Sequence, residues 1–264
     1  MKSKKAVLFS LMSLLLLISI LVISNVYLQS NKDQNRHANR FLYASRLQFI
    51  ENDVALDIIE LLGLEVDIIR DIDRSSIYIK DLMLNDQSIT LAPYAAFLKN
   101  NFSKVINNQI NLTQLSEFNI NNIKLDLRDK SVSIDNLSNI YSIDIALKAT
   151  SVGDINNTVH PATQGSGSFV NVTIEDYNSN IVLDENLQFE LGQNQIAFNA
   201  SNGGEYVSLT LSNNLMNIDS TIDINLDIKI TFIDNRQIKL TIGNSSMTSM
   251  VGIDKGGPIL LAKG

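Results

Sequence analysis

Two histidines come closest in this chain to a catalytic or metal-binding arrangement. His160 lies near Asp154, in a segment that also contains Pro161 and Gly165, where an imidazole could act as a base or a metal ligand. His37 lies in a charged stretch, where we expect a solvated side chain. A lone histidine in a loop usually has no chemical role, so we expect neither residue to be catalytic.

Side chains that carry oxygen ligands occur twice at alternate positions, as Asp71-Ile-Asp73 and as Asp223-Ile-Asn-Leu-Asp227. A calcium loop of this kind needs glycine at its sixth position and glutamate at its twelfth, and both are absent. The intervening Ile and Leu predict the polar face of a strand instead. The chain also lacks a phosphate-binding loop, a dinucleotide fingerprint, a zinc-binding helix and a nucleophile elbow. We therefore expect no enzyme, no cofactor and no metal.

Composition excludes further classes of function. The net charge of −7 argues against a nucleic-acid partner, which needs a basic surface. Without cysteine the chain has neither disulfides nor a thiolate metal site. The absence of tryptophan disfavours a sugar cleft built on indole rings. Carboxylates that cleave glycosides meet in space rather than in sequence, so a hydrolase remains an open alternative.

The first 24 residues predict a membrane anchor. Three lysines precede an uncharged apolar run from Ala6 to Ser24, which is long enough for one transmembrane helix with a cytoplasmic N-terminus. We expect this helix to remain uncut, in the cell membrane, with the bulk of the chain extracytoplasmic. Cleavage as a signal peptide near Ser24, or as a prepilin after Ala6, are the alternatives. The anchor residues are Ala6, Phe9, Leu15, Leu17, Ile20 and Val22.

Residues 25–63 predict one amphipathic juxtamembrane helix that ends at Gly63, a natural C-cap. Apolar residues recur there at steps of three and four, which marks one helix face. This stripe is either a stalk that packs against other copies or a surface docked on the chain's own domain. Its residues are Tyr43, Leu47, Ile50, Val54 and Ile58.

Residues 64–119 predict a mixed segment that packs on the head. Short strands are expected at 64–69 and 76–84. A helix is expected from Pro93, in its first turn, to about Asn111, with a further turn over 113–118.

Residues 120–244 predict an antiparallel β-sandwich with one buried face on each sheet. Hairpins are expected at 123–134 and 170–183, and 153–168 is expected to be a mobile loop. The clearest strand, 221–232, is expected to pair with 238–242 across Asp234-Asn235. The tail, 245–264, is expected to be flexible or to add an edge strand. The predicted fold class is therefore α+β, with a transmembrane helix, an amphipathic helical segment and this sandwich.

Asn-x-Ser/Thr triplets mark acceptors for glycosylation if the host modifies them. They begin at Asn101, Asn111, Asn136, Asn156, Asn171, Asn199 and Asn244.

The layout of Lys5 to Leu62, and the run FLYASRLQFIENDVALDIIELLG from Phe41 to Gly63, resemble the pilin-like and membrane-anchored surface proteins of archaea. The resemblance implies a surface-exposed head and assembly through the N-terminal helix, and it transfers no catalytic residues.

Three functions follow from these observations. We expect a structural or adhesive surface protein whose partners are the membrane, envelope components or other copies. The first alternative is a tethered ligand-binding module for an envelope polymer, recognised by carboxylates or tyrosines that meet in one cleft. Its candidate tyrosines are Tyr94, Tyr141, Tyr177 and Tyr206. The second alternative is a hydrolase that uses His160 with a nearby acid.

Overall fold

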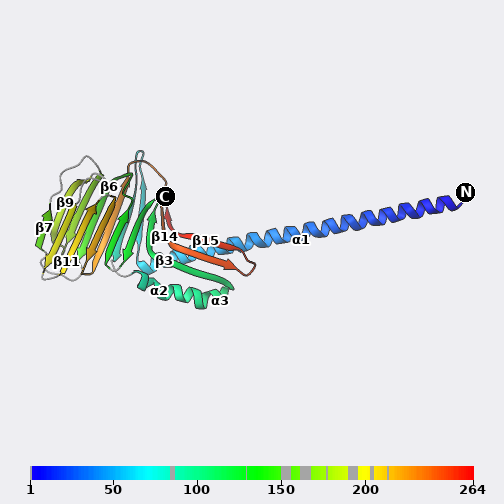
Figure 1. The fold of residues 1–264 in the computed structure, drawn as a ribbon, viewed down its shortest axis with the longest axis horizontal. Coiled ribbons are helices and arrows are strands. Elements are labelled where there is room, and N and C mark those ends of the chain that lie inside the picture. The colour runs from blue at the N-terminus through cyan, green and yellow to red at the C-terminus, as the bar shows by residue number, and fades with distance from the viewer. Residues whose placement is uncertain are drawn as a thin grey trace.

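The fold is a long helix that carries a β-rich head at its C-terminal end (Figure 1). The computed structural model describes residues 2–83, 87–128, 130–149, 156–160, 168–176, 178–189, 196–202, 205–212 and 214–264. Side chains are described from Leu16 onward, apart from some beside the gaps. The helical elements are α1 (Lys2–Leu62), α2 (Gln87–Phe97), the π-helical turn η1 (Leu98–Phe102) and α3 (Ser103–Ile106).

The strands form two sheets. The six-stranded sheet contains, in spatial order, β1 (Glu65–Arg70), β2 (Ser75–Met83), β13 (Ile224–Phe232), β6 (Ile140–Ala149), β8 (Ser168–Glu175) and β9 (Ile181–Phe189). The nine-stranded sheet contains β15 (Asp254–Lys263), β14 (Lys239–Ser249), β3 (Asn108–Ile120), β4 (Ile123–Arg128), β5 (Ser131–Asp135), β12 (Leu215–Ser220), β11 (Glu205–Ser212), β10 (Ile196–Asn202) and β7 (Asn156–His160). Both sheets contribute apolar side chains to one core, which includes Phe118 and Phe232.

Helix α1 divides into an exposed part and a docked part. From Leu16 to Arg46 almost every side chain is exposed, and this part extends away from the head (Figure 1). Among the residues whose side chains the structure describes, no helix is both long and apolar enough to cross a membrane. The predicted anchor residues Ala6, Phe9 and Leu15 lie in α1, but their side chains are outside the described part of the chain.

The docked part of α1 buries the apolar stripe that its spacing predicts. Leu47, Ile50, Val54 and Ile58 are between 0% and 7% exposed, and Tyr43 is half-buried where docking begins. This face packs against β14 and β15. Of the two predictions for the stripe, docking on the chain's own domain is therefore the one observed.

An ion pair fixes the docked part of α1 to the edge strand of the head. Lys255 of β15 pairs with the Glu51 carboxylate and also donates to Gln48 Oε1 at 2.6 Å. Ser245 of β14 donates to Glu51 at 3.3 Å. The Glu51 side chain is only 13% exposed, which shields these contacts from solvent.

Two predicted hairpins are confirmed and one is wrong. Leu125 pairs with Ile134, and Ile174 pairs with Leu183, as the alternation predicts. The strand over 224–232, in contrast, does not pair with 239–249. Strand β13 lies between β2 and β6, whereas β14 lies between β3 and β15 in the other sheet. Two consecutive strands alternate in the same way whether they pair as a hairpin or lie in different sheets. The alternation alone therefore could not show that β13 and β14 belong to different sheets.

The expectation of wholly antiparallel sheets is wrong at one pair. β6 and β8 are parallel, with Ile143 beside Val170 and Leu147 beside Ile174. Between these strands the chain adds β7 to the nine-stranded sheet and then returns to the six-stranded one. Because the chain crosses to the other sheet and back, β8 runs in the same direction as β6. The nine-stranded sheet is antiparallel throughout its described pairs.

The helical prediction for 93–118 is wrong at both ends. Helix α2 begins at Gln87, so Pro93 lies inside it, because burial of Leu91 extends the helix on its N-terminal side. Residues 108–120 form β3, although Leu112, Leu115 and Phe118 are spaced three apart as in a helix. Gln114 has a φ of 55° and interrupts the alternation, so a bulged strand imitates helical spacing. The tail follows the edge-strand alternative, since Asp254–Lys263 forms β15.

Candidate functional site: a polar groove on the nine-stranded sheet

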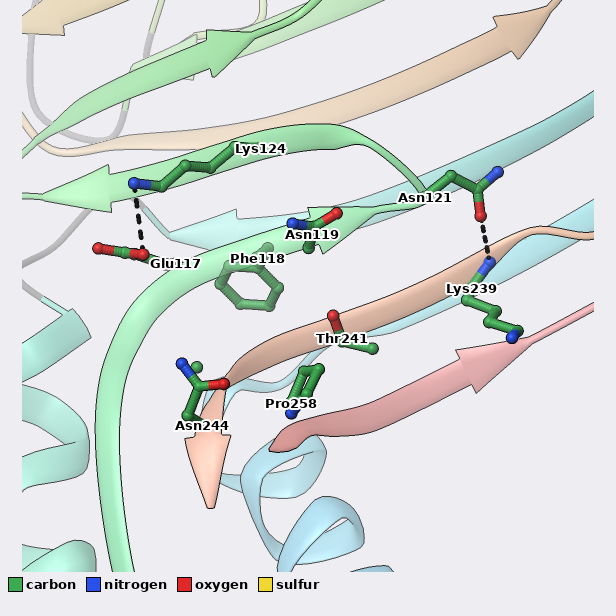
Figure 2. Close-up of a pocket in the computed structure, with 10 residues that line it drawn as sticks. Glu117, Phe118, Asn119, Asn121, Lys124, Lys239, Thr241, Asn244 and Pro258 are labelled. Carbon is green, nitrogen blue, oxygen red and sulfur yellow. Dashed lines mark hydrogen bonds and ion pairs between the residues drawn. The ribbon is translucent and has the colours of Figure 1, made fainter. Parts of the chain in front are cut away.

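A groove of about 350 Å³ crosses β3, β4, β14 and β15 on the nine-stranded sheet (Figure 2). Phe118 contributes to its base and is 1% exposed. The ring of Pro258 lies at its lower side in the close-up. Its other lining residues are polar apart from one glycine: Glu117, Asn119, Asn121, Lys124, Lys239, Thr241, Gly243 and Asn244.

Irregular backbone in two neighbouring strands shapes this groove. In β14 the register shifts between Ile242 and Asn244, and the intervening Gly243 has a φ of 45°. A β-carbon on Gly243 would lie 2.4 Å from the carbonyl oxygen of Thr113, so only glycine fits this approach. Gln114 of β3, directly beside it, is also left-handed. The paired irregularity redirects both strands. Strand β14 contacts α1, and β3 contacts α2 and α3.

One end of the groove is a compensated charge network. Glu117 pairs with Lys124 at 3.3 Å and with Arg128 at 2.9 Å. Asp126 pairs with Arg128 at 3.0 Å and with Lys124 at 3.9 Å. The two carboxylates are each 18% exposed, and the two cations balance them. This end therefore has no excess charge with which to select an ion.

The other end contains two asparagines whose side chains are used within the fold, and three side chains whose polar groups are unused. Asn121 Oδ1 accepts from the backbone N–H of Lys239 at 3.0 Å, and Asn244 donates to Gln114 at 2.7 Å. Within the described residues, no hydrogen bond or ion pair is recorded for the side chains of Asn119 and Thr241 or for Lys239 Nζ. A polar ligand could use these groups above the Pro258 ring.

The groove has no arrangement of nucleophile and base. Its side chains supply amides, a hydroxyl and a paired carboxylate, which bind and orient rather than transfer groups. In the part of the chain that the structure describes, no group of three His, Cys, Asp or Glu residues is placed to hold a metal. Sequence reasoning missed this groove, and its one signal was an isolated glycine, Gly243, inside a strand pattern.

The predicted histidine and carboxylate sites are separate from the groove. His37 lies on the exposed part of α1. His160 ends strand β7 and pairs with Ala197, so it is not in a loop; its side chain and Asp154 lie outside the described residues. Asp227 accepts from Tyr78 at 3.3 Å, as expected for the polar face of a strand.

The candidate tyrosines that the structure describes do not meet in one cleft. Tyr94 donates to Asp57 at 2.5 Å, and burial, followed by this hydrogen bond, raises its pKa. Tyr141 packs on the ring of Phe169. Tyr206 donates to Asp219 at 3.0 Å, and this hydrogen bond raises its pKa. Tyr177 lies outside the described residues.

The glycosylation triplets differ in how accessible their asparagines are. Asn101, Asn111 and Asn244 are exposed, and the side chains of Asn156 and Asn199 lie outside the description. Asn136 donates to the carbonyl of Asn122 at 3.0 Å in a left-handed turn. Asn171 donates to Asp144. The amides of these last two residues are thus used within the fold, as is that of the exposed Asn244, which donates to Gln114.

Comparisons with protein-family models, with curated proteins and with solved structures found no match to this chain.

Proposed function

We propose that this protein is a single-pass, membrane-anchored surface protein that presents a β-sandwich head outside the cell for adhesion or assembly. The observation that carries the proposal is the exposed apolar surface of α1. Seven large apolar side chains there are 49–68% exposed and have no cover from the head: Leu16, Leu17, Ile18, Ile20, Leu21, Val22 and Ile23. Such a surface is stable only when lipid or another protein covers it.

The geometry of α1 supports a stalk between the membrane and the head. The apolar run ends at Ser24, and docking on the head begins near Leu47. The 22 helical residues between these points are about 33 Å long at a rise of 1.5 Å per residue. They carry charged and amide side chains, including Lys32, Asp33 and Arg36, which suit an aqueous stalk.

The head is suited to a passive role. One core joins its two sheets, and neither disulfides nor a metal are needed to hold it. The layout also supports the resemblance to archaeal pilin-like surface proteins, in which α1 would pack against other copies once its leader is removed. A free N-terminus at Val7 would favour this form of the proposal.

Fractionation of cells that produce the full chain tests the anchor. Leu17→Arg should release the protein from the membrane fraction, because arginine near a helix centre costs about 2.5–3.5 kcal/mol of insertion free energy. Ser30→Arg places the same charge on the stalk and should leave fractionation unchanged. Equal membrane retention of Leu17→Arg and the wild type would overturn the proposal.

The mass of the native N-terminus completes this test. An intact chain in the membrane fraction supports an uncut anchor, and a start at Val7 supports prepilin-type assembly. A start near Asn25 with release to the medium would contradict anchoring.

A second candidate is a tethered binding module for an envelope polymer, which the groove of Figure 2 favours. Its unused amide and hydroxyl groups match a neutral, hydroxyl-rich chain such as tetra-N-acetylchitotetraose. Binding should weaken in Thr241→Val/Asn119→Leu and persist in Thr173→Val/Asn186→Leu, which makes the same changes on the six-stranded sheet. Equal binding by both variants would count against this candidate.

A further inference from the structure

Two adjoining cavities form a trough between the η1–α3 segment and the ends of β3 and β14. Their volumes are about 440 and 280 Å³. They share Lys99, Ser103, Gln109 and Thr248 in their linings. In Figure 1, α3 lies beside β3, at the side of the head from which α1 extends. We call this feature the basic trough.

The basic trough carries uncompensated positive charge. Lys99 and Lys104 are exposed, and within the described residues neither has a recorded ion pair or hydrogen bond. No carboxylate lines either cavity. The nearest acid by strand register is Asp254, which pairs with Thr248 but lies outside the lining. Two free ammonium groups over a carboxylate-free wall, in a chain of net charge −7, favour an anionic ligand.

A buried donor in the trough has no partner of its own. Asn108 is 5% exposed and lines the larger cavity. Its Nδ2 has no hydrogen-bond partner among the described residues. A buried donor without an acceptor is costly, and such groups are rare in folded proteins. A ligand oxygen that reached Nδ2 from the adjoining cavity would remove this cost.

Local structure holds the lysines over the cavity. Ser103 donates to the carbonyl of Leu98 at 2.7 Å and accepts from the N–H of Ile110 at 3.1 Å, which ties the helical segment to β3. The wide turn of η1 closes hydrogen bonds between residues five apart. Lys99 and Lys104 have that spacing and both line the larger cavity.

We propose that the basic trough binds an acidic polysaccharide, a chain in which carboxylates alternate with neutral hydroxylated sugars. The lysines would pair with the carboxylates, and Asn108, Gln109 and Thr248 would hydrogen-bond to hydroxyl or ring oxygens. The net charge of −7 disfavours ligands with a charge on every unit, such as nucleic acids. Under the anchored arrangement proposed above, a stalk of about 33 Å keeps the trough away from the headgroups of its own membrane.

Calorimetry on the full chain in detergent tests this proposal with a hyaluronan tetrasaccharide as the probe, at about 50 mM salt. Asn111 lines the smaller cavity and belongs to a glycosylation triplet, so the protein should come from a host that does not glycosylate. Lys99→Gln/Lys104→Gln should weaken binding about tenfold. Lys148→Gln/Lys263→Gln makes the same charge change outside the trough and should bind as the wild type does.

Asn108→Leu gives an independent readout. It should weaken binding of the tetrasaccharide without lowering the urea midpoint, because it removes an unpartnered donor rather than a used one. If Asn108 had only a structural role, Asn108→Leu would lower the urea midpoint and leave binding of the tetrasaccharide unchanged.

Three outcomes would overturn the proposal. One is absence of binding by the wild type, and another is equal binding by the two lysine double variants. The third is competition by inorganic phosphate at the same concentration as the tetrasaccharide, which would show a simple-anion site. None of these results depends on whether α1 spans a membrane, so the surface-anchor proposal is tested separately.

Discussion

Replacing Gly243 by alanine should destabilise the head far more than the same change at Gly252. Both residues have a positive φ, 45° and 71°, so alanine at either one costs about 1 kcal/mol in backbone strain. At Gly252 nothing lies within 4 Å of the new β-carbon. At Gly243 that carbon would lie 2.4 Å from Thr113 O and 2.8 Å from Gln114 O. Both obstacles are backbone atoms, which cannot rotate away as a flexible side chain does.

Relief of this contact requires β3 and β14 to separate where they are paired. Forced overpacking of this kind typically costs about 1–3 kcal/mol. We therefore expect Gly243→Ala to lower the free energy of unfolding by about 2–4 kcal/mol, against about 1 kcal/mol for Gly252→Ala. Urea unfolding followed by far-ultraviolet circular dichroism measures both values. Equal losses in the two variants would refute the reasoning, since the strained φ would then be the whole effect.

Two further predictions concern the docked helix and a turn. Ile58→Ala should lower the free energy of unfolding by about 2–4 kcal/mol, because Ile58 is fully buried. Leu56 lies on the opposite face of α1 and is 64% exposed, so Leu56→Ala should cost under about 0.5 kcal/mol. Equal losses of the two variants in urea unfolding would contradict the docking of α1. Hydrogen bonds from the side chain and backbone of Asn180 lower the pKa of Asp176. A depressed carboxyl pKa gives stability that is present above the ordinary value and lost as pH falls below about 4. The melting temperature of Asp176→Asn should therefore be lower at neutral pH and fall less steeply in acid than that of the wild type, and parallel pH profiles would argue against this role.

The sequence by itself determined which residues are apolar, where, and with what period. The stripe from Tyr43 to Ile58 predicted one apolar helix face, and its members Leu47, Ile50, Val54 and Ile58 are buried. Strict alternation from Ile224 to Phe232 predicted a strand with one buried face, and the exposure alternates residue by residue. These features depend on local geometry, since the helical and strand periods decide which side chains share a face.

Only the tertiary structure decided which strands pair and where the grooves lie. The links after β6 and β13 carry the chain into the other sheet, and alternation is the same whether a strand turns back or crosses over. The irregularity at Gln114 made a strand resemble a helix in spacing, because one unpaired residue shifts the buried positions. Lys99 and Asn108 line one cavity, although one lies in a helical turn and the other in a strand. Spacing along the chain records neither pairing nor cavities, because both arise from contacts between residues distant in sequence.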